Sequence, residues 1–356
     1  MRRSTRHGAG HGAAFGSGCV LAAAVLWGTT GTAAVLAPGV GSLAVGAAAM
    51  GVGGLLQAAV ALGAVRAHRA GLSAQRRTLA VAAAAVAVYP LAFYSSMRLA
   101  GVAVGTVVSI GSAPVAAALV ERVVDRRPLS RRWALGAAAG VLGVLALAIA
   151  RAGQEAVTGA PGAPGARPVL GIALGLLAGA TYALYSWAAA RMMRRGLPSR
   201  PVMGAVFGSG GVLLLPVLLL TGAPVVASWS NLAVVAYLAV VPMFLGYVLF
   251  GRGLATVPAS TATSLSLLEP AVAAVIAVLV LHERLPALGW AGMAVLLASL
   301  VVLTSGPGRQ RRDPDRQHPA AAPSRHAVAE TDVVATRSGT APAADPPSTQ
   351  ACRETL

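Results

Sequence analysis

The chain has 356 residues, of which 56% are hydrophobic and only 11% are charged, and its mean hydropathy is +0.72. Soluble proteins carry about a quarter charged residues, so this composition excludes an ordinary soluble domain. The formal net charge of +17 does not indicate a nucleic-acid-binding protein. The basic residues lie between apolar runs of about 20 residues instead of forming one basic patch.

Ten segments are apolar and long enough to cross a bilayer as helices, which need roughly 20 such residues and satisfy their own backbone groups. In chain order, the predicted spans are residues 15–36, 42–64, 79–98, 103–121, 133–150, 169–190, 202–221, 231–251, 258–281 and 286–304. They fall into two halves, residues 15–151 and 169–304, with five spans each. Residues 1–14 form a cytoplasmic N-terminus, residues 152–168 a Gly/Pro-rich linker, and residues 305–356 a polar tail expected to be disordered.

The two halves share sequence features at corresponding positions. Residues 99–106 (LAGVAVGT) recur as residues 254–261 (LATVPAST). Residues 51–54 (GVGG) and 208–211 (GSGG) also share a glycine spacing, which is typical of closely packed membrane helices. Because each half has an odd number of spans, the second half is inverted relative to the first. The expected fold is therefore an all-α integral membrane protein of ten transmembrane helices in two inverted five-helix repeats.

The arginines are distributed unevenly between the predicted loops, and the chain contains no lysine. With the N-terminus inside, 17 arginines outside the tail lie at the inner face and 4 lie at the outer face. Membrane proteins keep an excess of positive charge in their cytoplasmic loops. We therefore expect a multi-pass protein of the bacterial cytoplasmic membrane with both termini in the cytoplasm.

Motifs in both halves indicate a family. The second half contains Ser266-Leu-Leu-Glu269-Pro270, an Ala/Val run, Leu-His-Glu283-Arg284-Leu-Pro, and Gly289-Trp-Ala-Gly292; the first contains Trp27-Gly28 and Ser112-Ala-Pro114. Over about residues 15–304 the chain resembles the EamA-like family of drug/metabolite transporters. The resemblance implies a ten-helix bundle and a secondary carrier that usually exports amino acids, metabolites or drugs. The family's Glu-Arg pair in the first half is replaced by Asp125-Arg126 or Glu121-Arg122, so no role is transferred to Asp125.

Glu269 is the only acidic residue that the predicted spans place deep in the membrane. A carboxyl there costs about 2.5–3.5 kcal/mol on insertion scales, so it should face a cavity or a partner. Pro270, like Pro114 in the first half, predicts a helix break and cannot donate to the carbonyl of Ser266. Low dielectric favours the neutral, protonated carboxyl, which makes Glu269 a candidate for proton coupling. The simpler interpretation is that Glu269 caps freed backbone groups or pairs with a neighbouring helix.

Aromatic residues are few, so their positions are informative. Trp27 and Tyr182 are repeat equivalents near the middle of their spans, and Tyr185 shares a helical face with Tyr182. The simpler interpretation is an interfacial aromatic belt, which suits Trp187 and Tyr94. Gln57 either lines a site or bridges two helices. The predicted substrate-binding or coupling residues are Glu269, Ser266, Trp27, Tyr182, Tyr185 and Gln57.

Other chemistry is not indicated. Two cysteines and six scattered histidines offer neither a disulfide framework nor the spacing of metal ligands. The sequence contains no Gly-Lys-Ser phosphate-binding motif, which argues against an ATP-driven pump. We therefore expect no metal, no cofactor, no enzymatic activity and no nucleic-acid partner. The expected partners are a small-molecule substrate, membrane lipids and a coupling proton.

Three functions compete on the sequence alone. The favoured hypothesis is a secondary transporter that exports small metabolites, amino acids or drugs by alternating access. The second is a membrane-embedded enzyme acting on lipid-linked substrates, for which only Glu121 and Asp125 offer an acidic pair at one membrane surface. The third is a membrane sensor or assembly protein whose tail, residues 305–356, binds a partner.

The predicted topology can be tested by cysteine labelling. Single cysteines at Arg6, Val157 and Ser324 are introduced where Cys19 and Cys352 have been replaced by serine. Because the arginine asymmetry places residues 152–168 outside and both termini inside, an impermeant thiol reagent should label position 157 in intact cells and leave the other two unlabelled. Strong labelling at position 6 or 324, or none at 157, would contradict the topology.

Overall fold

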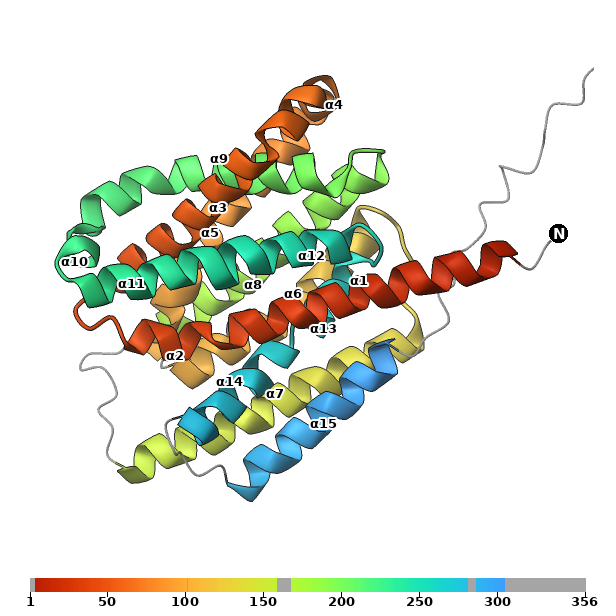
Figure 1. Cartoon of the computed structure of the whole chain (residues 1–356). Helices are drawn as coiled ribbons and strands as arrows, with labels where there is room; N and C mark the ends of the chain where they lie inside the picture. The colour runs from red at the N-terminus through yellow and green to blue at the C-terminus, as the bar shows by residue number, and fades with distance from the viewer. Residues whose placement is uncertain (1–3, 101, 159–167, 281–285, 305–356) are drawn as a thin grey trace, which may run out of the picture. The chain divides into compact units, whose positions relative to one another are not determined.

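The computed structural model describes residues 4–100, 102–158, 168–280 and 286–304, and these residues form helices and no strand. The helices are α1 (Ser4–Gly28), α2 (Thr30–Val35), α3 (Ser42–Ala67), α4 (Arg69–Ala74), α5 (Arg76–Ala100), α6 (Val102–Val123), α7 (Arg131–Thr158), α8 (Pro168–Arg194), α9 (Ser199–Thr221), α10 (Ala223–Val226), α11 (Trp229–Leu238), the π-helix η1 (Ala239–Leu245), α12 (Gly246–Leu254), α13 (Ala259–Leu265), α14 (Leu268–Val280) and α15 (Ala287–Thr304). Figure 1 shows their arrangement.

The ten predicted spans are confirmed, because ten helical segments of the described chain are long and apolar enough to cross a membrane. The short helices α4 and α10 lie between spans and had no signal in the hydropathy. Helix α7 continues past Arg151 to Thr158, into the segment expected to be a linker. The predicted tail, residues 305–356, and the Glu283-Arg284 pair lie outside the described residues.

Three spans are interrupted within the described residues. The first span breaks at Thr29 between α1 and α2, and the eighth contains the π-helix η1 around Pro242. The ninth breaks between α13 and α14, just before Pro270. The break predicted at Pro114 is wrong, because α6 is continuous through that residue. A proline removes one backbone donor, but neighbouring helices allow a membrane helix to tolerate that loss.

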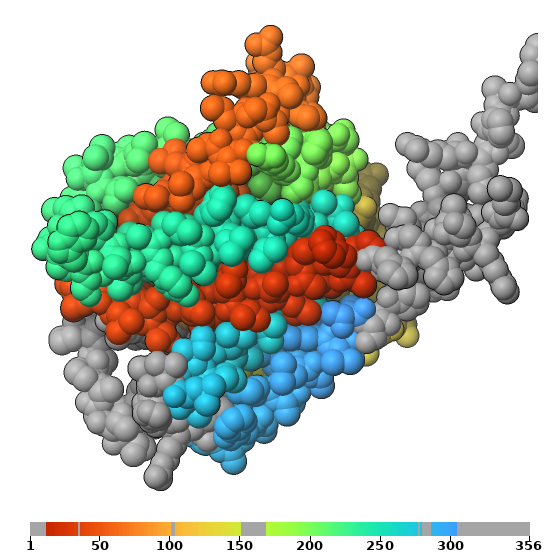
Figure 2. Space-filling view, in the orientation of Figure 1, coloured from red at the N-terminus to blue at the C-terminus, as the bar shows by residue number. Residues whose placement is uncertain are grey.

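The helix pairing has the pattern expected of two related halves. Helix α3 packs on α9 and α7 on α15, so each of these pairs joins a helix to its repeat equivalent (Figure 1). The contact of α5 with α8 has its counterpart in that of α12 with α1. Likewise, α6 packs on α8 as α14 packs on α1. This exchange of contacts between halves is compatible with the inverted repeat predicted from the sequence, which stays a prediction. On the face shown in Figure 2, the coloured part of α1 lies between α11–α12 and α14–α15.

The two glycine-rich segments lie in the closest of these contacts, where α3 crosses α9. A Cβ atom at Gly54 would lie 2.3 Å from the carbonyl oxygen of Phe207, and one at Gly211 would lie 2.7 Å from that of Gly51. Neither backbone can give way cheaply. The predicted role of residues 51–54 and 208–211 in helix packing is therefore confirmed.

Substitution at this crossing should destabilise the fold. Gly54→Ala forces α3 and α9 apart, and overpacking of this kind costs about 1–3 kcal/mol. The matched control is Gly63→Ala on the same helix, where a new Cβ meets nothing within 4 Å. We expect a lower melting temperature for Gly54→Ala in detergent, and for Gly63→Ala an unchanged or slightly higher one because alanine favours helix. Equal melting temperatures for the two variants would contradict this packing.

Candidate functional site

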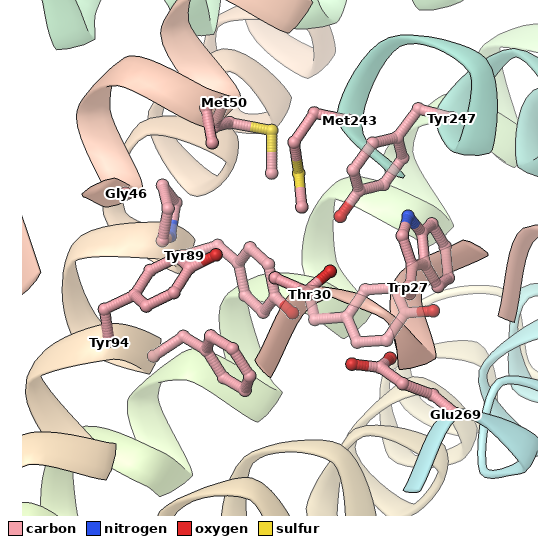
Figure 3. Close-up of a pocket in the computed structure, with 13 residues that line it drawn as sticks. Trp27, Thr30, Gly46, Met50, Tyr89, Tyr94, Met243, Tyr247 and Glu269 are labelled. Atoms are coloured by element: carbon pink, nitrogen blue, oxygen red, sulfur yellow. The ribbon is translucent and has the colours of Figure 1, made fainter. Parts of the chain in front are cut away.

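A small cavity lies among helices drawn from both halves of the chain. Its volume is about 20 Å³, which is room for roughly one water molecule. Its lining residues are Trp27, Thr30, Gly46, Ala49, Met50, Tyr89, Pro90, Phe93, Tyr94, Tyr182, Met243, Tyr247 and Glu269 (Figure 3). Helices α1, α2, α3 and α5 supply the first nine, and α8, η1, α12 and α14 supply the rest.

All three interrupted spans reach this cavity. Thr30 follows the break between α1 and α2, Met243 lies in the π-helix, and Glu269 lies in the first turn of α14. Irregular backbone at membrane depth is tolerated where it is buried in protein or lines a cavity. Insertions of the π type are frequent at functional sites. The irregular backbone therefore marks the same place as the cavity.

Trp27 joins the first span to the π-helix. Within η1 the N–H of Gly246 donates to Val241, five residues earlier, instead of to Pro242, four residues earlier. The indole Nε1–H of Trp27 donates to the Pro242 carbonyl at 2.9 Å. A Cβ at residue 246 would lie 2.7 Å from that indole nitrogen, so the ring packs there because residue 246 is glycine.

Gln57 has a comparable role beside Trp27 but does not line the cavity. Its buried Nε2 donates to the carbonyl of Met243 at 3.5 Å, the long limit of a hydrogen bond. The side chain therefore bridges α3 and η1, as the simpler interpretation of a lone amide predicted. A part for Gln57 in substrate binding stays a prediction.

Aromatic rings form one connected, buried cluster around the cavity. Within the described chain its nine members are Trp27, Tyr89, Phe93, Tyr94, Tyr182, Tyr185, Phe207, Tyr247 and Phe250. Neighbouring centroids are 4.4–6.2 Å apart, the range of favourable aromatic pairs. Trp27 is in the middle, with Tyr247 at 4.8 Å and Tyr182 at 6.2 Å. The rings from both halves thus form a continuous wall.

Most tyrosine hydroxyls in this wall are paired. The Tyr182 hydroxyl donates to Ser266 Oγ at 2.8 Å, and Ser266 Oγ donates to the carbonyl of Thr263 at 2.8 Å. The hydroxyls of Tyr185 and Tyr247 lie 2.8 Å apart. Ser266 and Tyr185 therefore lie behind the lining and hold it in place. The Ser266 carbonyl, expected to be free, accepts from the N–H of Glu269 at 3.0 Å.

The Glu269 carboxylate and the hydroxyls of Thr30 and Tyr94 line the cavity and have no partner within the described chain. The Glu269 side chain is partly buried, and its carboxylate receives neither a hydrogen bond nor an ion pair there. The Thr30 Oγ1 and Tyr94 hydroxyl oxygens are buried and unbonded. Figure 3 shows these groups directed toward the space between the rings. The cavity is thus a small aromatic chamber with one carboxylate and two free hydroxyls.

A second polar cluster ties helix ends together on the side predicted to be cytoplasmic. Asp125 pairs with Arg191 and with Arg194, the latter at 2.6 Å, and accepts from Trp187 Nε1 at 2.9 Å. These contacts link the end of α6 to the end of α8. The guanidinium carbon of Arg191 also lies 5.1 Å from the centroid of the Trp187 ring.

Glu121 makes a separate contact at the same end of α6. It is buried, accepts from Ser260 Oγ at 2.6 Å, and so joins α6 to the start of α13. The acidic pair considered for an enzyme is therefore divided between two unrelated sets of partners. Among the described residues, no group of three His, Cys, Asp or Glu side chains is placed to hold a metal ion.

The structure brings Trp27, Tyr182 and Glu269 together on the cavity surface. The interpretation of Tyr94 as an interfacial belt residue is wrong, because its ring is 6% exposed and lines the cavity. Sequence reasoning also missed Thr30 and Tyr89. Tyr94 lies a few residues after Pro90, and Tyr247 lies a few residues after Pro242. This parallel between the two halves was the sequence signal that could have placed Tyr94 and Tyr247 at the site.

Comparisons with known proteins agree with the fold. The EamA-like transporter family matches residues 169–305. Over 299 residues the chain is 32% identical to the "Uncharacterized transporter YwfM" of Bacillus subtilis (strain 168), covering 82% of this chain and 94% of that protein. A solved chain described only as "Crystal structure of protein" is 21% identical, with a TM-score of 0.65 over 82% of this chain and 96% of that one. The last likeness concerns the fold alone.

Proposed function

Because the chain belongs to the EamA-like transporter family and has ten apolar helices, we propose that it is a secondary transporter working by alternating access. In this proposal it exports small metabolites, amino acids or drugs across the bacterial cytoplasmic membrane, with both termini in the cytoplasm. The observation that carries the proposal is the cavity at mid-span, which is lined from both halves and holds one carboxylate without a partner.

The position of the cavity supports alternating access. Secondary transporters place their sites near the membrane midplane, at the interface of two repeats and beside broken helices. Here Glu269 follows the break between α13 and α14, and Trp27 precedes the break between α1 and α2. The cavity volume of about 20 Å³ is too small for a metabolite, so entry requires the helices to separate.

The cluster around Asp125 suggests which side is closed. Under the proposed orientation, its contacts with Arg191 and Arg194, together with the contact of Glu121 with Ser260, lie at the cytoplasmic ends of α6, α8 and α13. They tie these ends together beneath the cavity. In this proposal, opening toward the cytoplasm breaks these contacts, while opening toward the outside leaves them in place.

Glu269 is the residue we assign to coupling. A charged carboxylate without a partner at mid-membrane is costly, so the residue alternates between a protonated form and a form that is paired with ligand or hydrated. Proton exchange at this one group, from the outside in one conformation and from the inside in the other, would link the proton gradient to export.

The two rival functions lack comparable support. An enzyme acting on lipid-linked substrates needs cooperating groups at one membrane surface, whereas Glu121 and Asp125 each bind other residues. A sensor or assembly protein would depend on residues 305–356. Deleting this tail distinguishes that rival, because a transporter core should keep its activity.

Replacing the carboxyl tests the coupling role. Glu269→Gln keeps the size of the side chain and removes its titration, so substrate accumulation driven by a pH gradient in proteoliposomes should fall to background. Exchange of substrate without a gradient should persist at saturating substrate, since the cavity is otherwise intact. Gradient-driven and exchange transport are measured on the same vesicles.

The matched control is Glu155→Gln, which makes the same chemical change outside the predicted spans and should leave both rates unchanged. Full gradient-driven transport by a folded Glu269→Gln protein would contradict the coupling role. Loss of both gradient-driven and exchange transport would also contradict a role in coupling alone.

A further inference from the structure

The walls of the cavity suggest the charge of its ligand. Six of the residues that line it are aromatic: Trp27, Tyr89, Phe93, Tyr94, Tyr182 and Tyr247. The ionisable acid among the lining residues is Glu269, and they include no arginine or histidine. A site built in this way offers negative charge and negative ring faces and no positive side chain. It therefore suits a cation and disfavours an anion.

Two other acids packed between the helices of the described chain, Glu121 and Asp125, differ from Glu269 because each has a partner. Asp125 is neutralised by Arg191 and Arg194, and Glu121 is hydrogen-bonded by Ser260. Carboxylates held away from water need such partners. Glu269 has none within the described chain, which leaves it free to be balanced by a ligand when it is ionised.

The aromatic rings provide the second half of such a site. Cations lie favourably over the faces of tryptophan and tyrosine rings, most of all where water is excluded. The free oxygens of Thr30 and Tyr94 can accept hydrogen bonds from N–H donors. Met50 and Met243 add flexible apolar surface on the same lining. Together these groups match an ammonium with N–H donors attached to an apolar body.

An anionic ligand fits poorly by the same criteria. The start of a helix attracts negative charge, but the first turn of α14 already carries Glu269. An anion would therefore meet a carboxylate and a wall of aromatic rings, with no positive side chain among the lining residues. The unbonded polar groups around the cavity include the Glu269 carboxylate and the hydroxyl oxygens of Thr30 and Tyr94, which can accept hydrogen bonds.

We infer that the cavity recognises a protonated organic amine, with its ammonium group between Glu269 and the rings of Trp27, Tyr89 and Tyr182. This inference rests on the proposed transport function for its biological meaning, and it names the substrate class of that site. When the amine binds, its ammonium group neutralises the Glu269 carboxylate in place of a bound proton. The apolar body of the ligand contacts Met50 and Met243.

A series of three ligands that share a phenethyl body and differ in their polar end group tests the charge preference. Phenethylammonium, phenethyl alcohol and phenylpropanoate are titrated calorimetrically into the purified full-length protein in detergent, and heats in detergent alone are subtracted. The ammonium should bind at least about tenfold more tightly than the alcohol, and the carboxylate should not bind measurably. Equal affinity for ammonium and alcohol, or tightest binding of the carboxylate, would overturn the inference.

Two variants locate the binding. Glu269→Gln should weaken phenethylammonium at least about tenfold and leave the alcohol unchanged. Tyr94→Phe should weaken the ammonium about two- to tenfold through the lost acceptor, whereas Tyr237→Phe, whose hydroxyl bonds Thr29 away from the lining, should have no effect. Unchanged ammonium binding by Glu269→Gln would overturn the site. If that variant does not fold, the ligand series on the unmodified protein still tests whether the site prefers the ammonium.

The binding assay needs no transport, which separates the two proposals. Failure of phenethylammonium to bind overturns the amine site and leaves the transporter assignment standing on its family and fold. Binding that depends on Glu269 supports the amine site even if reconstituted vesicles move no substrate, a result that would count against the proposed transport function alone.

Discussion

Every backbone polar group at membrane depth must find a partner inside the protein, and this constraint shapes the centre of the molecule. Three spans are interrupted there, and each interruption leaves backbone groups to be satisfied. Trp27 donates to Pro242, Gln57 donates to Met243, and the backbone of Glu269 donates to Ser266. These bonds hold the irregular segments at fixed positions around one cavity.

The Glu269 carboxylate differs from the other two acids packed between these helices, and this difference explains the site. The buried acids Glu121 and Asp125 have partners within the described chain, while Glu269 faces the cavity without one. The close glycine contact between α3 and α9 and the pairing of α5 with α8 bring the two halves near enough for one ring cluster to line that cavity. A mobile proton and a cationic ligand are the natural partners of a carboxylate placed in this way.

The sequence was sufficient for the features that depend on local composition. Hydropathy predicted the ten spans. The high free-energy cost of placing a carboxyl in lipid indicated Glu269 before its surroundings were known. Trp27 and Tyr182 were found through their repeat positions. Their presence on the cavity surface agrees with that reasoning, although their part in binding stays a prediction.

The features that depend on tertiary contacts could not be predicted in the same way. Pro114 lies in a continuous helix, whereas Pro242 lies in a π-helix, and nothing local to either proline distinguishes them. The difference comes from neighbours such as Trp27, which bonds the Pro242 carbonyl. Tyr94 has the sequence signature of an interfacial residue, but packing against Phe93 buries its ring in the cavity wall.

Carbodiimide modification offers the most direct test of the claim that Glu269 is an unpartnered carboxyl open to the cavity. Dicyclohexylcarbodiimide enters apolar regions and reacts with protonated carboxyls, and peptide mass spectrometry identifies the modified residue. In the lipid-reconstituted protein, Glu269 should be modified and Glu121, bonded to Ser260, should react much more slowly. Modification of Glu121 while Glu269 stays intact would contradict the account.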